Sequence, residues 1–172
     1  DRAVELGIGT IVIDSAQEID RIASAASQRG VVQRIRLRVN SGVHASTHSF
    51  LATAHEDQKF GVTLGDAPRL VEAIRNRPNL NFVGLHCHIG SQIFGTEGFA
   101  ESARRLLEVH ADLLAGGAIP ELNLGGGFGI AYTDHALHSH ASLLALCGLA
   151  VFLGVGAHLR RVRQRQNAMR AK

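Results

Sequence analysis

The feature that most constrains the fold is the alternation of short apolar runs with amphipathic stretches along the first 133 residues. Helix-length stretches occur at residues 15–30, 66–76 and 96–114, and strand-length runs lie beside them at residues 10–14, 34–40, 82–89 and 121–124. No Asn-Gly hairpin signal joins two consecutive runs. The sequence therefore predicts parallel strands connected by helices.

Two folds are built from such units, an open doubly wound sheet and a (β/α)8 barrel. The run at residues 34–40 helps to distinguish between them. Its aliphatic and polar side chains alternate, with Ile35, Leu37 and Val39 on one face and Arg36, Arg38 and Asn40 on the other. A polar face suits the interior of a barrel near the carboxyl ends of its strands. A whole barrel requires roughly 250 residues. We therefore predict an α/β fold that comprises about half of a (β/α)8 TIM barrel.

The charge differs between the body and the end of the chain. Residues 1–133 hold 12 Arg or Lys against 14 Asp or Glu, whereas residues 134–172 hold 6 against 1. The body therefore lacks the basic surface expected of a nucleic-acid-binding protein. We divide the chain into a barrel domain at residues 1–133 and an apolar-then-basic tail at residues 134–172.

The tail contains an uncharged 17-residue run at residues 141–157, followed by five Arg. This length is at the lower limit for a membrane-spanning helix. The alternative, which we favour, is a truncated or out-of-frame segment, so we predict no membrane anchor. The chain has only two cysteines and no signal-peptide pattern, and both observations are typical of a cytoplasmic protein.

His86 and His88 share one face of the predicted strand at residues 82–89. Three interpretations are open: two metal ligands, ordinary hydrogen bonding inside a barrel, or one wall of a cofactor pocket. A metal site would need further ligands, and the other strand ends offer only Asp14, Asn40 and Gly125.

Small residues follow the last two predicted strands. Ser91 comes shortly after His88, and Gly125, Gly126 and Gly127 follow residues 121–124. Consecutive backbone N–H groups without side chains suit a phosphate dianion, although tight turns also use glycine for steric reasons. Together, these residues predict a phosphorylated ligand whose aromatic ring lies against an imidazole.

Three segments of the chain resemble the diaminopimelate decarboxylases, members of the fold type III (alanine-racemase-like) class of pyridoxal-phosphate enzymes. They are residues 37–62, residues 84–94 (GLHCHIGSQIF) and residues 122–132 (LNLGGGFGIAY). The likeness covers about residues 3–132. It implies a homodimeric carboxy-lyase that uses pyridoxal 5′-phosphate to convert meso-2,6-diaminopimelate, a small amino acid, to L-lysine.

The resemblance also implies roles for individual residues. His88 would stack on the pyridoxal ring, Ser91 would hydrogen-bond the phosphate, and Gly125, Gly126 and Gly127 would form the phosphate-binding loop. Arg38 would project inward, either near the cofactor or in a structural ion pair. Lys59 would lie near the site and the subunit interface, and His86 receives no role.

The same resemblance implies that parts of the site lie outside this sequence. The lysine that anchors the cofactor covalently has no counterpart here, because the two lysines present are Lys59 and Lys172. The acidic partner of the pyridine nitrogen and the distal substrate-binding residues are also missing. We therefore assign no catalytic residue and no metal ligand, and we expect a fragment that is inactive alone. The alternatives are a non-catalytic pyridoxal-phosphate-binding barrel and, more distantly, a metal-dependent hydrolase using His86 and His88.

Overall fold

The computed structural model describes residues 1–43 and 60–129 and contains helices that alternate with parallel strands. Its elements, in chain order, are α1 (Arg2–Glu5), β1 (Thr10–Ile13), α2 (Ala16–Gln28), β2 (Gln33–Asn40), β3 (Val62–Thr63), α3 (Ala67–Arg75), β4 (Leu80–His86), α4 (Glu97–Leu113), the 3-10 turn η1 (Leu114–Gly116) and β5 (Glu121–Asn123). The predicted helices and strands are confirmed to within a few residues. The strand predicted at residues 82–89 ends at His86, so His88 lies beyond it. The two-residue strand β3 was not predicted.

All strand pairs are parallel, as predicted. The sheet order is β1-β2-β4-β5, and β3 pairs with the end of β2. Each neighbouring pair in the main order is connected through a helix, which is the repeating unit of a (β/α)8 barrel. The fold is therefore α/β and contains about half of such a barrel.

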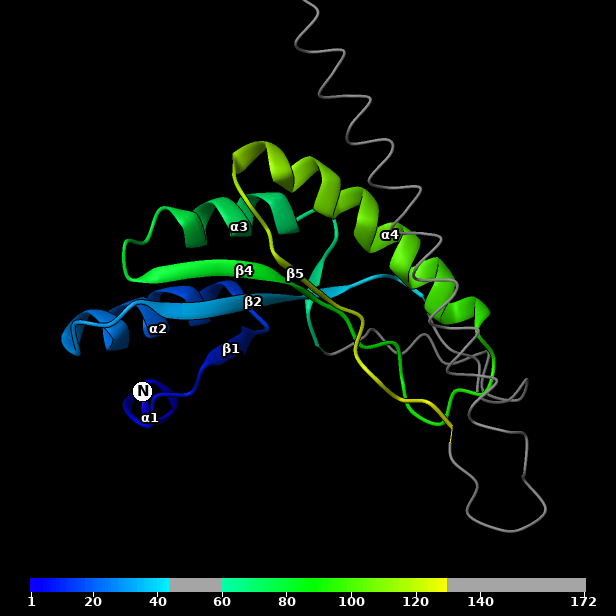
Figure 1. Cartoon of the computed structure of the whole chain (residues 1–172), viewed down its shortest axis with the longest axis horizontal. Coiled ribbons are helices and arrows are strands. Elements are labelled where there is room, and N and C mark those ends of the chain that lie inside the picture. The colour runs from blue at the N-terminus through cyan, green and yellow to red at the C-terminus, as the bar shows by residue number, and fades with distance from the viewer. Residues whose placement is uncertain (44–59, 130–172) are drawn as a thin grey trace, which may run out of the picture.

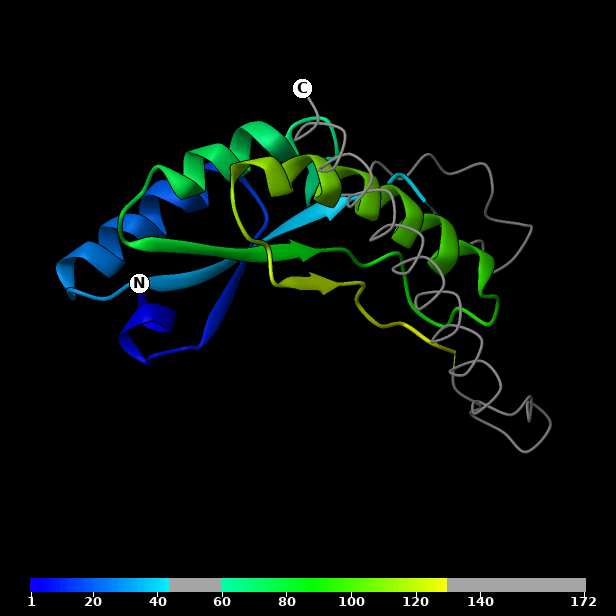
Figure 2. The ribbon, with the colours of Figure 1, turned by 45° about the horizontal axis from the view of Figure 1, so that its top comes forward.

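The helices α2, α3 and α4 lie on the same side of the sheet (Figures 1 and 2). Helix α2 begins at a capping box, in which the Glu18 carboxylate accepts a hydrogen bond of 3.1 Å from the backbone N–H of Ser15. The same carboxylate accepts a bond of 2.6 Å from the backbone N–H of Asp14. The cap therefore fixes where the chain turns from β1 into α2.

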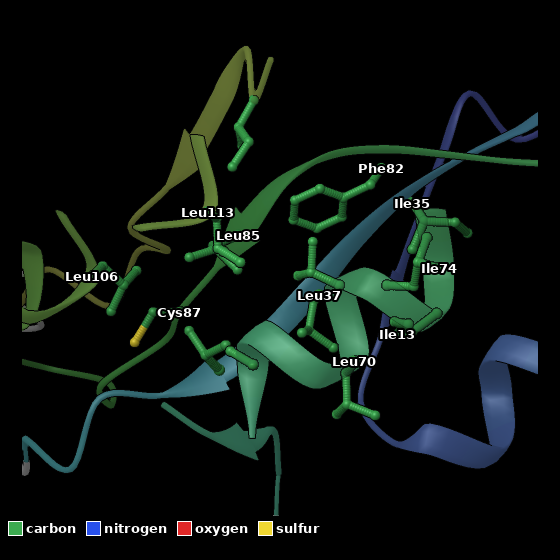
Figure 3. Close-up of a cluster of buried hydrophobic side chains, with 14 of the residues drawn as sticks. Ile13, Ile35, Leu37, Leu70, Ile74, Phe82, Leu85, Cys87, Leu106 and Leu113 are labelled. Atoms are coloured by element: carbon green, nitrogen blue, oxygen red, sulfur yellow. The ribbon is translucent and has the colours of Figure 1, made fainter. Parts of the chain in front are cut away.

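The hydrophobic core lies between the sheet and these helices. Figure 3 shows Ile35 and Leu37 of β2 packed among side chains of α3 and β4. The largest fully buried side chains of this cluster include Ile13, Ile35, Leu37, Ile74, Leu85 and Leu106. Their burial attaches one face of the sheet to its helices, and it leaves the other face to polar residues.

A register shift in β4 decides which of its side chains enter this core. Ile35 pairs with Phe82, but the next residue of β2, Arg36, pairs with Gly84, so Val83 is an extra residue. Before the shift, Leu80 and Phe82 belong to the core, and after it Leu85 and Cys87 do. Such a shift exchanges the two faces of a strand. It directs His86 away from the helices.

Several predictions lie outside the described residues. They concern Lys59, the boundary at residue 133 and the tail with its apolar run at residues 141–157, and the division of the chain there stays a prediction. None of the helices in residues 1–43 and 60–129 has the length and apolar character needed to cross a bilayer.

Candidate cofactor site at the strand ends

The chain continues beyond β4 and β5 as two segments that stay side by side. We call these segments, residues 87–94 and 124–129, the rim (Figure 2). The backbone N–H of Ile93 donates to the carbonyl of Gly127, and the N–H of Gly129 donates to the carbonyl of Ile93, each at 2.9 Å. The ring of Phe128, in the second segment, stacks on the ring of Phe99 of α4, with centroids 4.6 Å apart. The rim is therefore held by backbone pairing and by the core.

Close approach of these two segments requires glycine at two positions. A Cβ atom at Gly125 would collide with the carbonyl oxygen of Cys87, and one at Gly127 would collide with that of Gly90. Both glycines also have positive φ angles, 77° and 99°, which side chains rarely adopt. Steric requirements alone therefore explain Gly125 and Gly127.

Gly126 differs from its two neighbours. It has no positive φ, and a Cβ atom there would meet nothing within 4 Å. No described protein group therefore requires glycine at this position. Among the described residues, room for a ligand therefore lies next to Gly126.

The structure brings His88 together with the glycines at the rim. The His88 ring atom Nδ1 lies 3.1 Å from the Cβ position of Gly125, and Cε1 lies 3.4 Å from that of Gly127. Ser91 lies on the same rim segment as His88, and its side chain is exposed. The residue after it, Gln92, has a φ of 56°, and no other non-glycine residue in the described ranges has a positive φ. Strained backbone of this kind is often found at functional sites.

A row of polar side chains crosses the sheet directly below the rim. Arg38 of β2 pairs with His86 of β4, and His86 pairs with Asn123 of β5. Asp14, next to the end of β1, forms an ion pair with Arg38, with 3.8 Å between Oδ1 and Nε. Of the two roles open to Arg38, this contact matches the structural ion pair. No role was predicted for Asn123 from the sequence. The available signal was its position two residues after Glu121, which places both polar side chains on the same face of one strand.

A second polar group lies one step further from the rim. The Glu121 carboxylate bridges Arg34 and Arg36, and the bond from Arg36 Nε to Glu121 Oε2 is 2.7 Å. Glu121 is on β5 and the arginines are on β2, so its side chain crosses β4 at Gly84, where no side chain blocks it. Hydrogen bonding by Arg36 lowers the pKa of Glu121.

The polar row also affects the charge of His86. Burial lowers the pKa of His86, its hydrogen bond to Asn123 acts in the opposite direction, and the nearby guanidinium groups of Arg38 and Arg36 lower the pKa further. His86 is therefore held neutral at neutral pH. Within residues 1–43 and 60–129, no three His, Cys, Asp or Glu side chains gather as a group able to hold a metal ion.

Comparison with known proteins places this geometry in a family. Residues 1–147 match the family described as "Pyridoxal-dependent decarboxylase, pyridoxal binding domain". The chain is 44% identical to the diaminopimelate decarboxylase of Corynebacterium efficiens over 166 residues, which cover 90% of this chain and 36% of that protein. It is 43% identical to the diaminopimelate decarboxylase of Mycobacterium tuberculosis over 138 residues, which cover 76% of this chain and 31% of that protein. It thus spans about a third of the length of these relatives.

Solved structures give the same result. The diaminopimelate decarboxylase of M. jannaschii in complex with L-lysine superimposes with a TM-score of 0.75 at 27% identity, covering 92% of this chain and 37% of that one. The Helicobacter pylori diaminopimelate decarboxylase with L-lysine gives a TM-score of 0.72 at 26% identity, covering 87% and 38%. Sequence and fold therefore agree, and this chain belongs to the pyridoxal-dependent decarboxylase family.

Proposed function

We propose that this chain forms part of a pyridoxal-phosphate-dependent carboxy-lyase that converts meso-2,6-diaminopimelate to L-lysine and carbon dioxide. The observation that carries the proposal is the position of the His88 ring against Gly125 and Gly127 at the carboxyl ends of β4 and β5. Active sites of (β/α)8 barrels lie at this end of the strands. The names of the relatives support the substrate, because both sequences compared above are diaminopimelate decarboxylases.

The residues at the rim fit the two ends of pyridoxal 5′-phosphate. The backbone N–H groups of Gly126 and Gly127 and the hydroxyl of Ser91 would hold the phosphate, which accepts several hydrogen bonds. Gly125, whose N–H donates to the side chain of Asn123, would shape the loop. The His88 imidazole would lie on one face of the pyridine ring. The open space at Gly126 is the feature that the surrounding protein does not explain and that a bound phosphate would explain.

The bound cofactor supplies an electron sink for the bond that breaks to release carbon dioxide. The described residues would contribute binding and orientation. Contact with His88 would limit tilting of the ring, and the glycine loop would fix the distance of the ring from the sheet. Because both groups are attached to the same paired segments, ring and phosphate would be positioned together.

Binding of pyridoxine 5′-phosphate by the 172-residue chain tests this assignment. This compound lacks the aldehyde and cannot react with Lys59 or Lys172, so its affinity reports the non-covalent site alone. We expect the wild-type chain to bind it more tightly than pyridoxine, which lacks the phosphate. Gly126→Ala should reduce this preference and leave the melting temperature nearly unchanged, because the added methyl group meets no atom of the residues that the structure describes.

A control variant and two contrary outcomes complete the test. Gly9→Ala adds a methyl group at an equally open position far from the rim, and it should change neither quantity. Equal affinity for the two compounds in the wild-type chain would contradict the proposed phosphate site. Tight zinc binding that His88→Ala abolishes, with no binding of either compound, would favour the metal-dependent alternative.

Turnover by the isolated polypeptide is a separate question. We expect a purified chain of these 172 residues to release no carbon dioxide from diaminopimelate at saturating pyridoxal phosphate. The family resemblance implies that neither of its lysines, Lys59 and Lys172, is the residue that anchors the cofactor. Release of labelled carbon dioxide above that of a His88→Ala/Ser91→Ala control would contradict this expectation.

Assembly and location also belong to the proposal. A homodimer is supported by Phe60 and Phe94, two large apolar side chains that are more than half exposed in the isolated chain. A cytoplasmic location is supported by Cys87, a buried free thiol.

A further inference from the structure

The side-chain oxygen of Asn123 has two hydrogen-bond neighbours, one at the end of β4 and one in the rim. The backbone N–H of Gly125 donates to Asn123 Oδ1 at 2.8 Å. His86 Nδ1 lies 3.1 Å from the same oxygen. Asn123 thus connects a residue of β4 to the first residue of the glycine loop.

This arrangement determines which nitrogen of His86 carries the proton. A backbone N–H can only donate, so the bond from Gly125 requires the oxygen of the Asn123 amide, and not its NH2 group, at this position. The same oxygen faces His86 Nδ1 and can only accept. Nδ1 must therefore be the protonated nitrogen when the ring is neutral.

The surroundings of His86 favour the neutral ring. It is half-buried, and the guanidinium groups of Arg38 and Arg36 nearby disfavour a second proton. Asn123 is neutral and compensates only in part. His86 therefore has one proton, on Nδ1, and donates it to Asn123.

We propose that His86 is a positioning residue for the phosphate-binding loop, because its Nδ1–H holds the Asn123 amide in the orientation that binds the Gly125 N–H. The backbone of Asn123 is already held in place, since its carbonyl accepts a bond of 2.9 Å from the backbone N–H of Cys87, the residue after β4. Only the side-chain torsion remains free to turn, and His86 removes that freedom. This role depends on the proposed function, in which Gly125 belongs to the loop that holds the phosphate.

The first test requires no cofactor. In ¹⁵N-labelled chain at neutral pH, the long-range ¹H–¹⁵N spectrum should show His86 Nδ1 as the protonated nitrogen and Nε2 as the unprotonated one. In His86→Leu, the amide signal of Gly125 should shift, and its temperature dependence should become that of a weaker hydrogen bond. Protonation of Nε2 alone, or an unchanged Gly125 signal, would overturn the inference whether or not the cofactor binds.

The second test measures the preference for pyridoxine 5′-phosphate over pyridoxine, a ratio that a purely structural defect would leave unchanged. His86→Leu should lower this ratio about 3- to 10-fold, the effect of losing one hydrogen bond. Asn123→Leu should lower it at least as much, and the double variant should lose no more than Asn123→Leu alone, because the two residues act as one unit. His86→Gln, whose amide can still donate, should retain more of the preference than His86→Leu.

The control is Gly9→Ala, at an open position far from the rim, which should preserve the ratio. If Asn123→Leu lowers the ratio and His86→Leu leaves it unchanged, Asn123 acts without His86 and the proposal is wrong. If the wild-type chain shows no preference for the phosphorylated compound, the proposed function fails, and the nuclear magnetic resonance result still decides the role of His86.

Discussion

The side of the sheet that faces helices α2, α3 and α4 and the opposite side are stabilised by different interactions. On the helix-covered side, Ile13, Ile35 and Leu37 are completely buried. On the other side, which we call the polar face, Arg36, Arg38 and Glu121 form ion pairs while about a quarter of each side chain stays exposed. Burial of apolar surface is the larger source of stability, whereas partly exposed ion pairs contribute little. The polar face is therefore free to carry the site.

The strongest test of this contrast uses two neighbours on β1 that point to opposite sides. Ile13 is completely buried, whereas Val12 on the polar face is 40% exposed. Ile13→Ala should lower the free energy of unfolding by about 2–5 kcal/mol, because it removes buried methyl groups and leaves a cavity. Val12→Ala should cost about 1 kcal/mol or less. Urea denaturation measures both, and equal losses would contradict the distinction between the two sides.

A smaller effect is expected where the polar face depends on the absence of a side chain. Gly84→Ala places a methyl group against the backbone of Glu121. It should separate β4 from β5 and cost about 1–3 kcal/mol of unfolding free energy, the usual range for overpacking. Gly9→Ala, where the methyl group meets nothing, is the matched control and should be close to neutral.

The ion pairs of the polar face should make a still smaller contribution. Glu121→Gln removes the negative charge that bridges Arg34 and Arg36, and it should lower the melting temperature slightly at low salt. The difference from the wild type should shrink as sodium chloride is added, because salt screens partly exposed charges. A loss as large as that of Ile13→Ala would show that the ion pairs, and not the core, dominate.

The smallest effect concerns pH. Because the pKa of His86 is lowered in the folded chain, the unfolded chain binds the proton more readily, and acidification favours unfolding. The stability associated with neutral His86 is present above pH 6.5 and decreases as the pH falls from 6.5 through the lowered pKa. The urea midpoint of the wild type should therefore decrease between pH 7.5 and pH 5.5 by more than that of His86→Gln. An identical decrease in both chains would show that other groups cause it.

Much of the fold could be predicted because it depends on patterns within short stretches. The alternation in residues 34–40 placed Arg36 and Arg38 opposite Leu37, and the spacing of Ser15 and Glu18 is typical of a helix start, which is where α2 begins. The candidate site was predictable for a similar reason, since parallel strands end at one edge and bring His88 and the glycines together. The register shift at Val83 was harder to predict, although the apolar positions change from even numbers (Leu80, Phe82) to odd ones (Leu85, Cys87) there.

The sequence by itself determined the strand and helix order, the parallel sheet, the polar face and the rim residues His88, Ser91 and Gly125–Gly127. Only the tertiary structure decided that Glu121 reaches Arg36 across Gly84, that Asn123 binds both His86 and Gly125, and that Gly126, unlike its neighbours, adjoins open space. The physical reason is the range of the interactions. Periodicity and capping act between residues a few positions apart, whereas these contacts depend on the register of strands that are up to 85 residues apart in the chain.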